Sequence, residues 1–296
     1  MFAAFIIFYY SRAICASEIR YDIYHYPEKL NIRLQFIGED NGVTKLNIPD
    51  KIWGHDVSKQ IGNIRILDNN AELKDSDTLH YKKNSRINIS YDVVNINVVN
   101  SNKYFYTKSY EEGFFFLHDL ALIYPQHPDH TNVIINYHSS KNFKYFYISD
   151  AIKTGKKIST TLEELKGGIS VSGSNKILQI AKSANSTMLG FNVTQGNFTK
   201  LQYLTNQVLN SQKDICNINF GVNNFVFIGN KSEYQSYRGS VFKNNLILFF
   251  VPNMIDELTF KKLASHENFH KLIGSKSFIV IGQEYWPKKI ESGQLF

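Results

Sequence analysis

Two histidines and a glutamate near the end of the chain occur at a spacing that can support metal chemistry. His266 and His270 are four residues apart, and Glu267 directly follows the first of them. On a helix this spacing places both imidazoles on one face, about one turn apart, where they can bind one tetrahedral Zn²⁺. Glu267 could then act as general base on a water activated by the metal. The sequence therefore predicts Zn²⁺ as cofactor, His266 and His270 as ligands and Glu267 as the catalytic residue.

The surrounding residues predict the helix that this motif needs. Asn253 and Asp256 can form a capping-box-like pair before it, and Gly274 can end it. Its other residues are largely apolar and predict a mostly buried helix; they include Ser265, Phe269, Leu272 and Ile273. The alternative is a pair of surface or capping histidines on an unrelated helix. Burying two histidines and a glutamate without a metal or hydrogen-bond partners would be costly, so we favour the metal site.

The part of the chain before this helix has the pattern of a β-structure. From Glu18 to about Asn185 apolar and polar residues alternate with a period of two, as in half-buried antiparallel strands. The predicted strands are 19–26, 30–36, 61–67, 87–93, 104–106, 114–118, 133–137, 143–148 and 169–172. Turn residues such as Asn41-Gly42 separate them. Many short strands with such turns predict an N-terminal antiparallel β-sandwich.

The period changes near Asn197. Leu201, Leu204 and Val208 follow at helical spacing and predict an amphipathic helix over 199–212. Strands at 225–228 and 246–251 come next, and then the helix with the two histidines. We therefore predict an α+β chain, with a β-sandwich domain over 18–195 and a partial catalytic domain over 196–296.

The first residues predict export. Residues 2–10 form an apolar run that is too short to span a bilayer but has the length of a signal-peptide core. Ala16 offers a cleavage point, so we expect a signal peptide over 1–17 and a secreted or periplasmic protein. A first β-strand or a buried N-terminal helix is the alternative. No later segment has the 18 or so continuous apolar residues that an integral membrane segment requires.

Composition argues against several other classes. The net charge of +7 comes from scattered lysines and arginines, with no basic block and no nucleic-acid-binding motif, so we expect no nucleic acid as partner. Two cysteines are too few for a disulfide framework. Four histidines of the β-rich part, at irregular spacing, form an alternative metal group that we consider less favourable: His118, His127, His130 and His138.

The motif and the segment before it resemble the glycyl-aminopeptidase-type zinc peptidase family. The resemblance is carried by residues 263–270 and by 237–250, which contain Gly239 and Ser240. Members of that family have an N-terminal β-domain and a thermolysin-like, or gluzincin, catalytic domain. The resemblance implies zinc-dependent hydrolysis of a peptide or protein substrate. It also implies that the strand at 245–251 is the edge along which the substrate backbone pairs, with Gly239, Ser240 and Asn245 in substrate binding.

The resemblance also implies a third zinc ligand, a glutamate on a later helix. After the motif the sequence contains only two carboxylates, Glu284 and Glu291, and neither lies in the family's motif. Either could substitute, and we expect a catalytic domain that is cut short at Phe296. Two functions follow: a zinc-dependent, aminopeptidase-like metallopeptidase, or a truncated, inactive relative that acts as a β-sandwich binding or structural module. The sequence does not indicate an oligomeric state.

Overall fold

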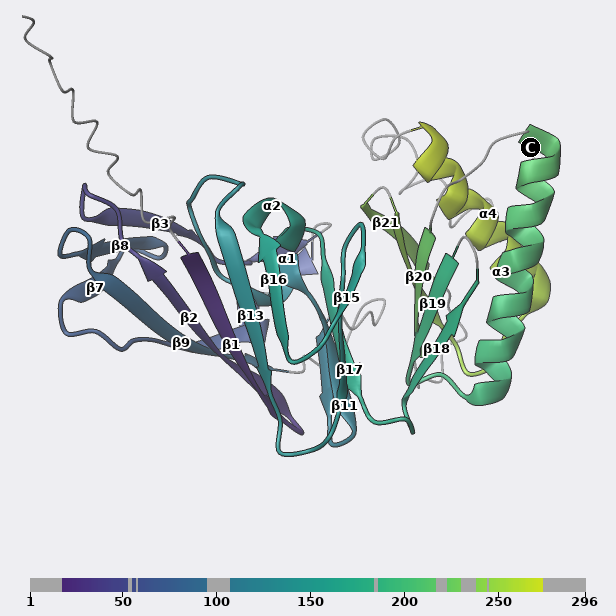
Figure 1. The fold of residues 1–296 in the computed structure, drawn as a ribbon, viewed down its shortest axis with the longest axis horizontal. Coiled ribbons are helices and arrows are strands. Elements are labelled where there is room, and N and C mark those ends of the chain that lie inside the picture. Colours follow the sequence, from purple (N-terminus) through teal and green to yellow (C-terminus); the bar gives the residue numbers. More distant parts are fainter. Residues whose placement is uncertain are drawn as a thin grey trace, which may run out of the picture.

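The structure is a computed structural model, which describes residues 18–52, 55–56, 58–94, 107–183, 186–216, 223–229, 238–243 and 245–273. The predicted signal peptide, the predicted strand at 104–106, Gly274, Glu284 and Glu291 lie outside the described residues. The described residues form a stack of layers, with two sheets of the β-rich part, a third sheet and then two helices (Figure 1).

The first layer is a six-stranded sheet. Its strand order is β16 (Lys157–Thr161), β13 (Asn132–His138), β1 (Glu18–Tyr26), β2 (Lys29–Ile37), β9 (Arg86–Val94) and β6 (Ile61–Ile66). Smaller sheets extend it, formed by β12 (Tyr124–Pro125), β3 (Val43–Asn47), β8 (Thr78–Tyr81) and β7 (Ala71–Lys74), and by β4 (Lys51–Ile52) and β5 (His55–Asp56). The 3₁₀ turn η1 (Ser58–Gln60) precedes β6.

The second and third layers are five-stranded sheets. The second has the order β10 (Thr107–Tyr110), β11 (Gly113–Leu117), β17 (Ile169–Gly173), β14 (Lys144–Ile148) and β15 (Ile152–Thr154). The third has the order β18 (Leu178–Lys182), β19 (Ser186–Phe191), β20 (Asn223–Gly229), β22 (Leu246–Val251) and β21 (Arg238–Lys243). Within the third sheet β19, β20 and β22 are parallel, whereas β18 and β21 are antiparallel to their neighbours.

Two long helices cover the outer face of the third sheet: α3 (Gln195–Cys216) and α4 (Glu257–Ile273) (Figure 1). The predicted face of α3 is confirmed, because Leu201, Leu204 and Val208 are buried against this sheet. Two single-turn helices, α1 (His118–Ala121) and α2 (Leu162–Leu165), lie in the β-rich part. None of the helices in the described residues is long and apolar enough to cross a membrane.

The strands of the inner layers contribute to two cores at once. Successive side chains of a strand point to opposite faces, so an apolar run lets a strand pack on both sides. In β11, Phe114 and Phe116 enter the core shared with the first sheet, while Phe115 and Leu117 enter the core shared with the third sheet. Alternate residues of β22 divide in the same way between that second core and the core beneath the helices. Because these strands lie between two other layers, they need apolar side chains on both faces, which explains their uninterrupted apolar sequences.

The structure corrects two features of the predicted β-sandwich. The prediction of an antiparallel arrangement is wrong for the centre of the first sheet, where β1 and β13 pair in parallel from Glu18↔Asn132 to Tyr24↔His138. The chain between these strands builds several other strands before it returns, and a connection of this length permits parallel pairing. The predicted strand at 114–118 also ends one residue early, because His118 begins α1.

The division of the chain into two units follows the hydrogen bonding of the third sheet. β18 and β19 precede the predicted boundary at 195/196, yet they pair with each other and β19 pairs with β20. Periodicity alone could not separate these strands from those of the β-rich part. We propose that the second unit begins with β18.

His118 belongs to a fully buried hydrogen-bond network. Its Nδ1 lies 2.9 Å from the carbonyl oxygen of Leu165 and its Nε2 lies 2.8 Å from Oγ of Ser170, which also contacts the hydroxyl of Tyr137. Because a carbonyl only accepts, Nδ1 carries the proton and Nε2 accepts from Ser170. Burial lowers the pKa of His118 to about 3. The ring is therefore neutral at pH 7 and joins β17 to α1 as a structural group.

This network predicts an acid sensitivity. In the unfolded chain His118 becomes protonated near pH 6.5, whereas in the folded chain it does so only near pH 3. The free energy of unfolding should therefore decrease as the pH is lowered from about 6.5 toward 3. At pH 5 the loss relative to pH 7.5 should be about 2 kcal/mol. In the H118N variant, the asparagine amide can replace the Nδ1 donor but does not titrate. The free energy of unfolding of H118N should therefore change less with pH over this range. Urea unfolding of both proteins from pH 5 to 7.5 measures the difference, and parallel profiles would contradict the assignment.

Candidate active site

Helix α4 carries the predicted zinc-binding motif and begins with a side-chain cap. The helix starts at Glu257, and Oδ1 of Asp256 accepts a hydrogen bond from the backbone N–H of Thr259 at 2.8 Å. The predicted capping box with Asn253 as the cap is wrong, because Asp256 itself occupies the cap position. The Asn253 carbonyl instead accepts from the side chain of Asn197 on α3 at 2.6 Å. This hydrogen bond thus connects the segment before α4 to α3.

The two predicted ligands converge on one face of α4. The Nε2 atoms of His266 and His270 are 2.8 Å apart, and the ring centroids are 4.3 Å apart with an interplanar angle of 83°. Two imidazoles on a tetrahedral zinc, each bonded at about 2.0–2.1 Å, hold their nitrogens roughly 3.3 Å apart. Small rotations of the side chains would reach that separation. The pair thus fits the metal expected for this spacing.

The electrostatics of the pair also suit a metal. Burial, together with the charge of His270, lowers the pKa of His266 to about 4. Burial likewise lowers the pKa of His270. Both rings are consequently neutral at pH 7, and neutral imidazole is the form that donates a lone pair to a metal.

Glu267 is buried beside the histidines. Its side chain is 6% exposed, and burial raises its pKa to about 7. Among the described residues no hydrogen bond to its carboxylate is found. A carboxylate without bound donors and with a pKa near neutrality can take a proton from a substrate water and pass it on.

Glu267 faces the strand β21 at Gly239. A methyl group at Gly239 would lie 2.4 Å from Cγ of Glu267 and 2.8 Å from its Oε1. Because a side chain here would displace the carboxylate, only glycine permits this close approach. The structure therefore brings one predicted substrate-binding residue into contact with the predicted catalytic residue.

The other predicted substrate-binding residues occupy different places. Ser240 follows Gly239 in β21 and is in register with Leu248 of β22. Asn245 lies at the turn end of this hairpin, where its backbone carbonyl accepts from the N–H of Asn224 at 2.7 Å. Along the strand this is about four residues, or roughly 13 Å, from the partner of Gly239.

The topology corrects the predicted substrate edge. The prediction that β22 is the edge strand is wrong, because it pairs with β20 on one side and β21 on the other. Among the described strands β21 forms this edge of the sheet. The two strands differ in sequence: β22 is apolar throughout, whereas β21 begins with Arg238 and ends with Lys243, as is typical of an edge strand.

The remaining contacts of α4 fix its position on the sheet. Phe260 and Ala264 are buried against the third sheet, with the ring of Phe260 5.4 Å from that of Phe249. The side chain of Gln212 on α3 donates to the carbonyl of Ser265 at 3.1 Å, one residue before the first histidine. Phe269, predicted among the buried residues, is instead 50% exposed.

The described residues contain two of the predicted zinc ligands, His266 and His270. No group of three histidine, cysteine or acidic side chains suitable for a metal occurs within them. Glu284 and Glu291 lie outside the described residues, so their relation to the two histidines is not defined by the structure. The alternative group of His118, His127, His130 and His138 is likewise not a metal cluster in the part of the chain described.

Comparisons with known proteins give a clear result only for the fold. No family model matches the sequence, and no curated protein matches it. The structure resembles an aminopeptidase N family protein from Idiomarina loihiensis, with a TM-score of 0.66 and 15% identity, over 90% of this chain and 50% of that one.

Two further similarities are weaker. They are to Legionella pneumophila aminopeptidase A in complex with aspartic acid (TM-score 0.46, 12% identity, 86% of this chain and 33% of that one) and to a mutant of an M1 zinc metallopeptidase from Deinococcus radiodurans (TM-score 0.38, 9% identity, 87% and 63%). The chain spans about half the length of the Idiomarina loihiensis protein. Over that shared half, the chain has the fold of an aminopeptidase N family protein.

Proposed function

We propose that the chain is part of a zinc-dependent, aminopeptidase-like metallopeptidase that hydrolyses peptide bonds. The observation that carries the proposal is the convergence of the His266 and His270 Nε2 atoms, 2.8 Å apart, beside the buried carboxylate of Glu267. The similarity of fold to an aminopeptidase N family protein supports it. We also propose that the unit from β18 onward is thermolysin-like and that its two histidines are zinc ligands.

The residues of the site would have distinct roles. Zinc, when bound, would supply Lewis-acid activation of water and of the scissile carbonyl. His266 and His270 would provide two of the three protein ligands that a catalytic zinc normally has, and Glu284 and Glu291 remain our candidates for the third. Glu267 would accept the proton of the attacking water at its carboxylate and deliver it to the leaving amine.

The edge of the third sheet would hold the substrate. An extended peptide can add to an exposed edge through backbone hydrogen bonds, and β21 offers such an edge at Gly239 and Ser240. A peptide paired there would lie next to Glu267, because Gly239 contacts that side chain. We further propose a peptide or protein as substrate and, from residues 1–17, a secreted or periplasmic location.

Zinc binding by the purified 296-residue chain tests the proposal. After removal of metals with a chelator, titration with Zn²⁺ should give one site per chain at pH 7.5. The H266A variant should weaken this site by about a hundredfold or more, because one direct ligand is lost. H130A serves as the matched control, since His130 is exposed and lies in the β-rich part.

The zinc titration also separates the two functions. Absence of zinc binding by the wild-type chain, or equal affinity in H266A, would overturn the metallopeptidase proposal. That outcome would favour the inactive β-sandwich module. A weakened site in H130A would show that zinc binds by scattered histidines rather than at α4.

A further inference from the structure

A line of polar residues crosses all six strands of the first sheet, far along the stack of layers from α4 (Figure 1). Neighbouring strands are in register here, so one residue of each strand belongs to the line. At about 4.8 Å between neighbouring strands, the line is roughly 24 Å long. We call it the cross-strand row, and from β16 to β6 it consists of Lys157, Asn136, Asp22, Arg33, Ser90 and Arg65.

All members of the cross-strand row lie on the outer face of the sheet. The residues next to them along each strand, such as Ile135, Ile23 and Ile32, belong to the core shared with the second sheet. Because successive side chains of a strand point to opposite faces, the row points away from that core. Each of its members is exposed or half-buried. The row is therefore accessible to a partner that approaches from outside the stack.

The charge of this face favours an anionic partner. Lys157, Arg33 and Arg65 are exposed, and among the described residues none of them forms an ion pair. The carboxylates of the six strands are already engaged by neighbouring side chains: Glu18 by Arg20, Asp92 by Lys29 and Asp22 by Asn136. Three cations of the row thus remain available for acidic groups of a ligand.

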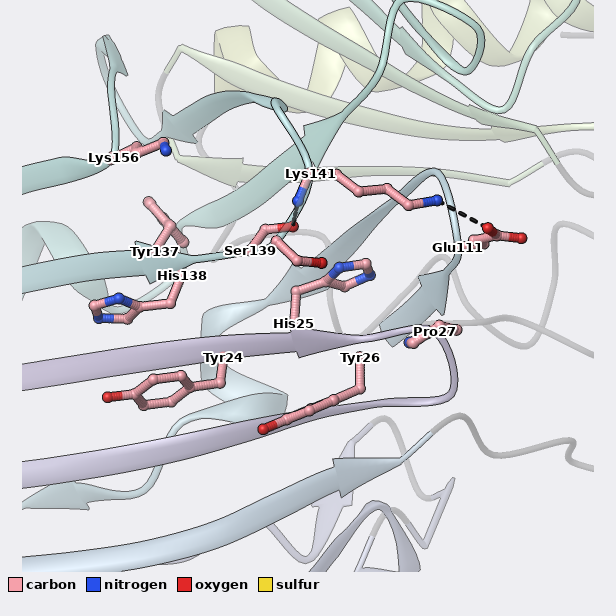
Figure 2. Close-up of a pocket in the computed structure, with 11 residues that line it drawn as sticks. Tyr24, His25, Tyr26, Pro27, Glu111, Tyr137, His138, Ser139, Lys141 and Lys156 are labelled. Atoms are coloured by element: carbon pink, nitrogen blue, oxygen red, sulfur yellow. Dashed lines mark hydrogen bonds and ion pairs between the residues drawn. The ribbon is translucent and has the colours of Figure 1, made fainter.

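The centre of the row is held in place by a network of side chains. Oδ1 of Asp22 accepts hydrogen bonds from Nδ2 of Asn136 at 2.9 Å and from Nε2 of His138 at 3.0 Å. The His138 ring stacks on Tyr24, with centroids 4.5 Å apart and an interplanar angle of 12° (Figure 2). The guanidinium of Arg33 lies 4.9 Å from the centre of the same Tyr24 ring. Asp22 and Arg33 are therefore positioned before a ligand arrives, which lowers the entropy cost of binding.

The order of charges along the row distinguishes between anionic polymers. A polymer with an acidic group on every unit, such as a nucleic acid or polyglutamate, would place one of them against Asp22, where like charges repel. Between its cations the row instead offers the amide of Asn136, the carboxylate of Asp22 and the hydroxyl of Ser90. These groups can form hydrogen bonds with the hydroxyls of a neutral sugar. The row thus fits a chain in which acidic units are separated by neutral ones.

We propose that the cross-strand row binds an acidic polysaccharide in which uronate and neutral sugars alternate. The uronate carboxylates would lie at Arg33, Arg65 and Lys157, and a neutral sugar would donate a hydroxyl hydrogen to Oδ2 of Asp22. Arg33 and Arg65 are two strands, or roughly 10 Å, apart, whereas Lys157 and Arg33 are three strands, or roughly 14 Å, apart. The flexible side chain of lysine stands at the wider interval, where it can adjust to the ligand.

Calorimetric titration of the full chain at low ionic strength tests the proposal. The probes are a hyaluronan octasaccharide, in which glucuronate alternates with a neutral sugar, and four comparison ligands of similar length: oligogalacturonate, a neutral cello-oligosaccharide, polyglutamate and a single-stranded oligonucleotide. Hyaluronan should bind saturably and at least tenfold more tightly than each of the others. No saturable binding of hyaluronan would overturn the proposal. Equal or tighter binding of any comparison ligand would also overturn it, because the partner would then belong to another class.

Three variants locate the binding. R65A and K157A, at the two ends of the row, should each weaken the affinity for hyaluronan about three- to tenfold, as expected for one exposed charge. K182A is the matched control, because it removes an exposed lysine from β18 in the third sheet, and it should bind like the wild type. Equal losses in K157A and K182A would show a general charge effect and overturn the assignment. Circular dichroism spectra confirm that each variant is folded.

Discussion

Replacing Glu267 by glutamine is expected to lower the rate of peptide hydrolysis about a thousandfold or more while zinc remains bound. A loss of this size is within the range of the rate contribution of general acid–base catalysis. Glutamine has nearly the same shape but cannot accept the proton of the attacking water. The carboxylate is buried, with its pKa raised to about 7, and among the described residues it has no hydrogen-bond partner that the substitution would remove. Hydrolysis of unblocked peptides at saturating zinc, together with metal analysis, measures both quantities.

A second substitution tests the position of the Glu267 carboxylate without removing it. G239A should also lower hydrolysis, because the new methyl group would displace the Glu267 carboxylate, whose side chain can move at small cost in stability. G196A is the matched control, since no atom lies within 4 Å of the added methyl group. Unchanged turnover in E267Q, with zinc bound, would remove Glu267 from its assigned role.

The sequence predicted the local part of the site and missed the part that depends on tertiary contacts. His266 and His270 share a face because both lie on one helix, and helical spacing is visible in the sequence. The contact of Glu267 with Gly239 joins a helix to a strand that comes earlier in the chain, and nothing in the local pattern marks it. A hollow lined by His25 and Lys141, at the ends of β1 and β13, was missed for the same reason, since these residues come together only after the two strands have paired.

Fold prediction had the same limit. Strands such as β22 were found because apolar runs of this length reveal a strand buried on both faces. The edge strand was assigned wrongly from the family resemblance, although the polar residues of β21 are typical of an edge strand and the apolar run of β22 is typical of an interior one. The parallel pairing of β1 with β13 and the membership of β18 in the third sheet depend equally on contacts between distant segments.

Replacing Gly229 by alanine is expected to destabilise the chain strongly, because β20 passes very close to the backbone that follows β19. A methyl group at Gly229 would lie 1.9 Å from the carbonyl oxygen of Asn192 and 2.6 Å from its carbon. These are backbone atoms, and Asn192 is anchored by a hydrogen bond from its N–H to the carbonyl of Ile177 at 2.7 Å and has a positive φ of 57°. Relief of the clash must therefore shift β20 against the end of β19.

The cost should be about 3 kcal/mol, at the upper end for overpacking, because neither backbone segment can move freely. For a chain of this size that loss lowers Tm by about 5 °C or more. Thermal unfolding followed by circular dichroism measures it. G62A is the matched control, since its added methyl group has no atom within 4 Å, and its Tm should stay close to that of the wild type. Equal Tm values for G229A and G62A would mean that β20 and Asn192 separate without cost, contrary to their close packing.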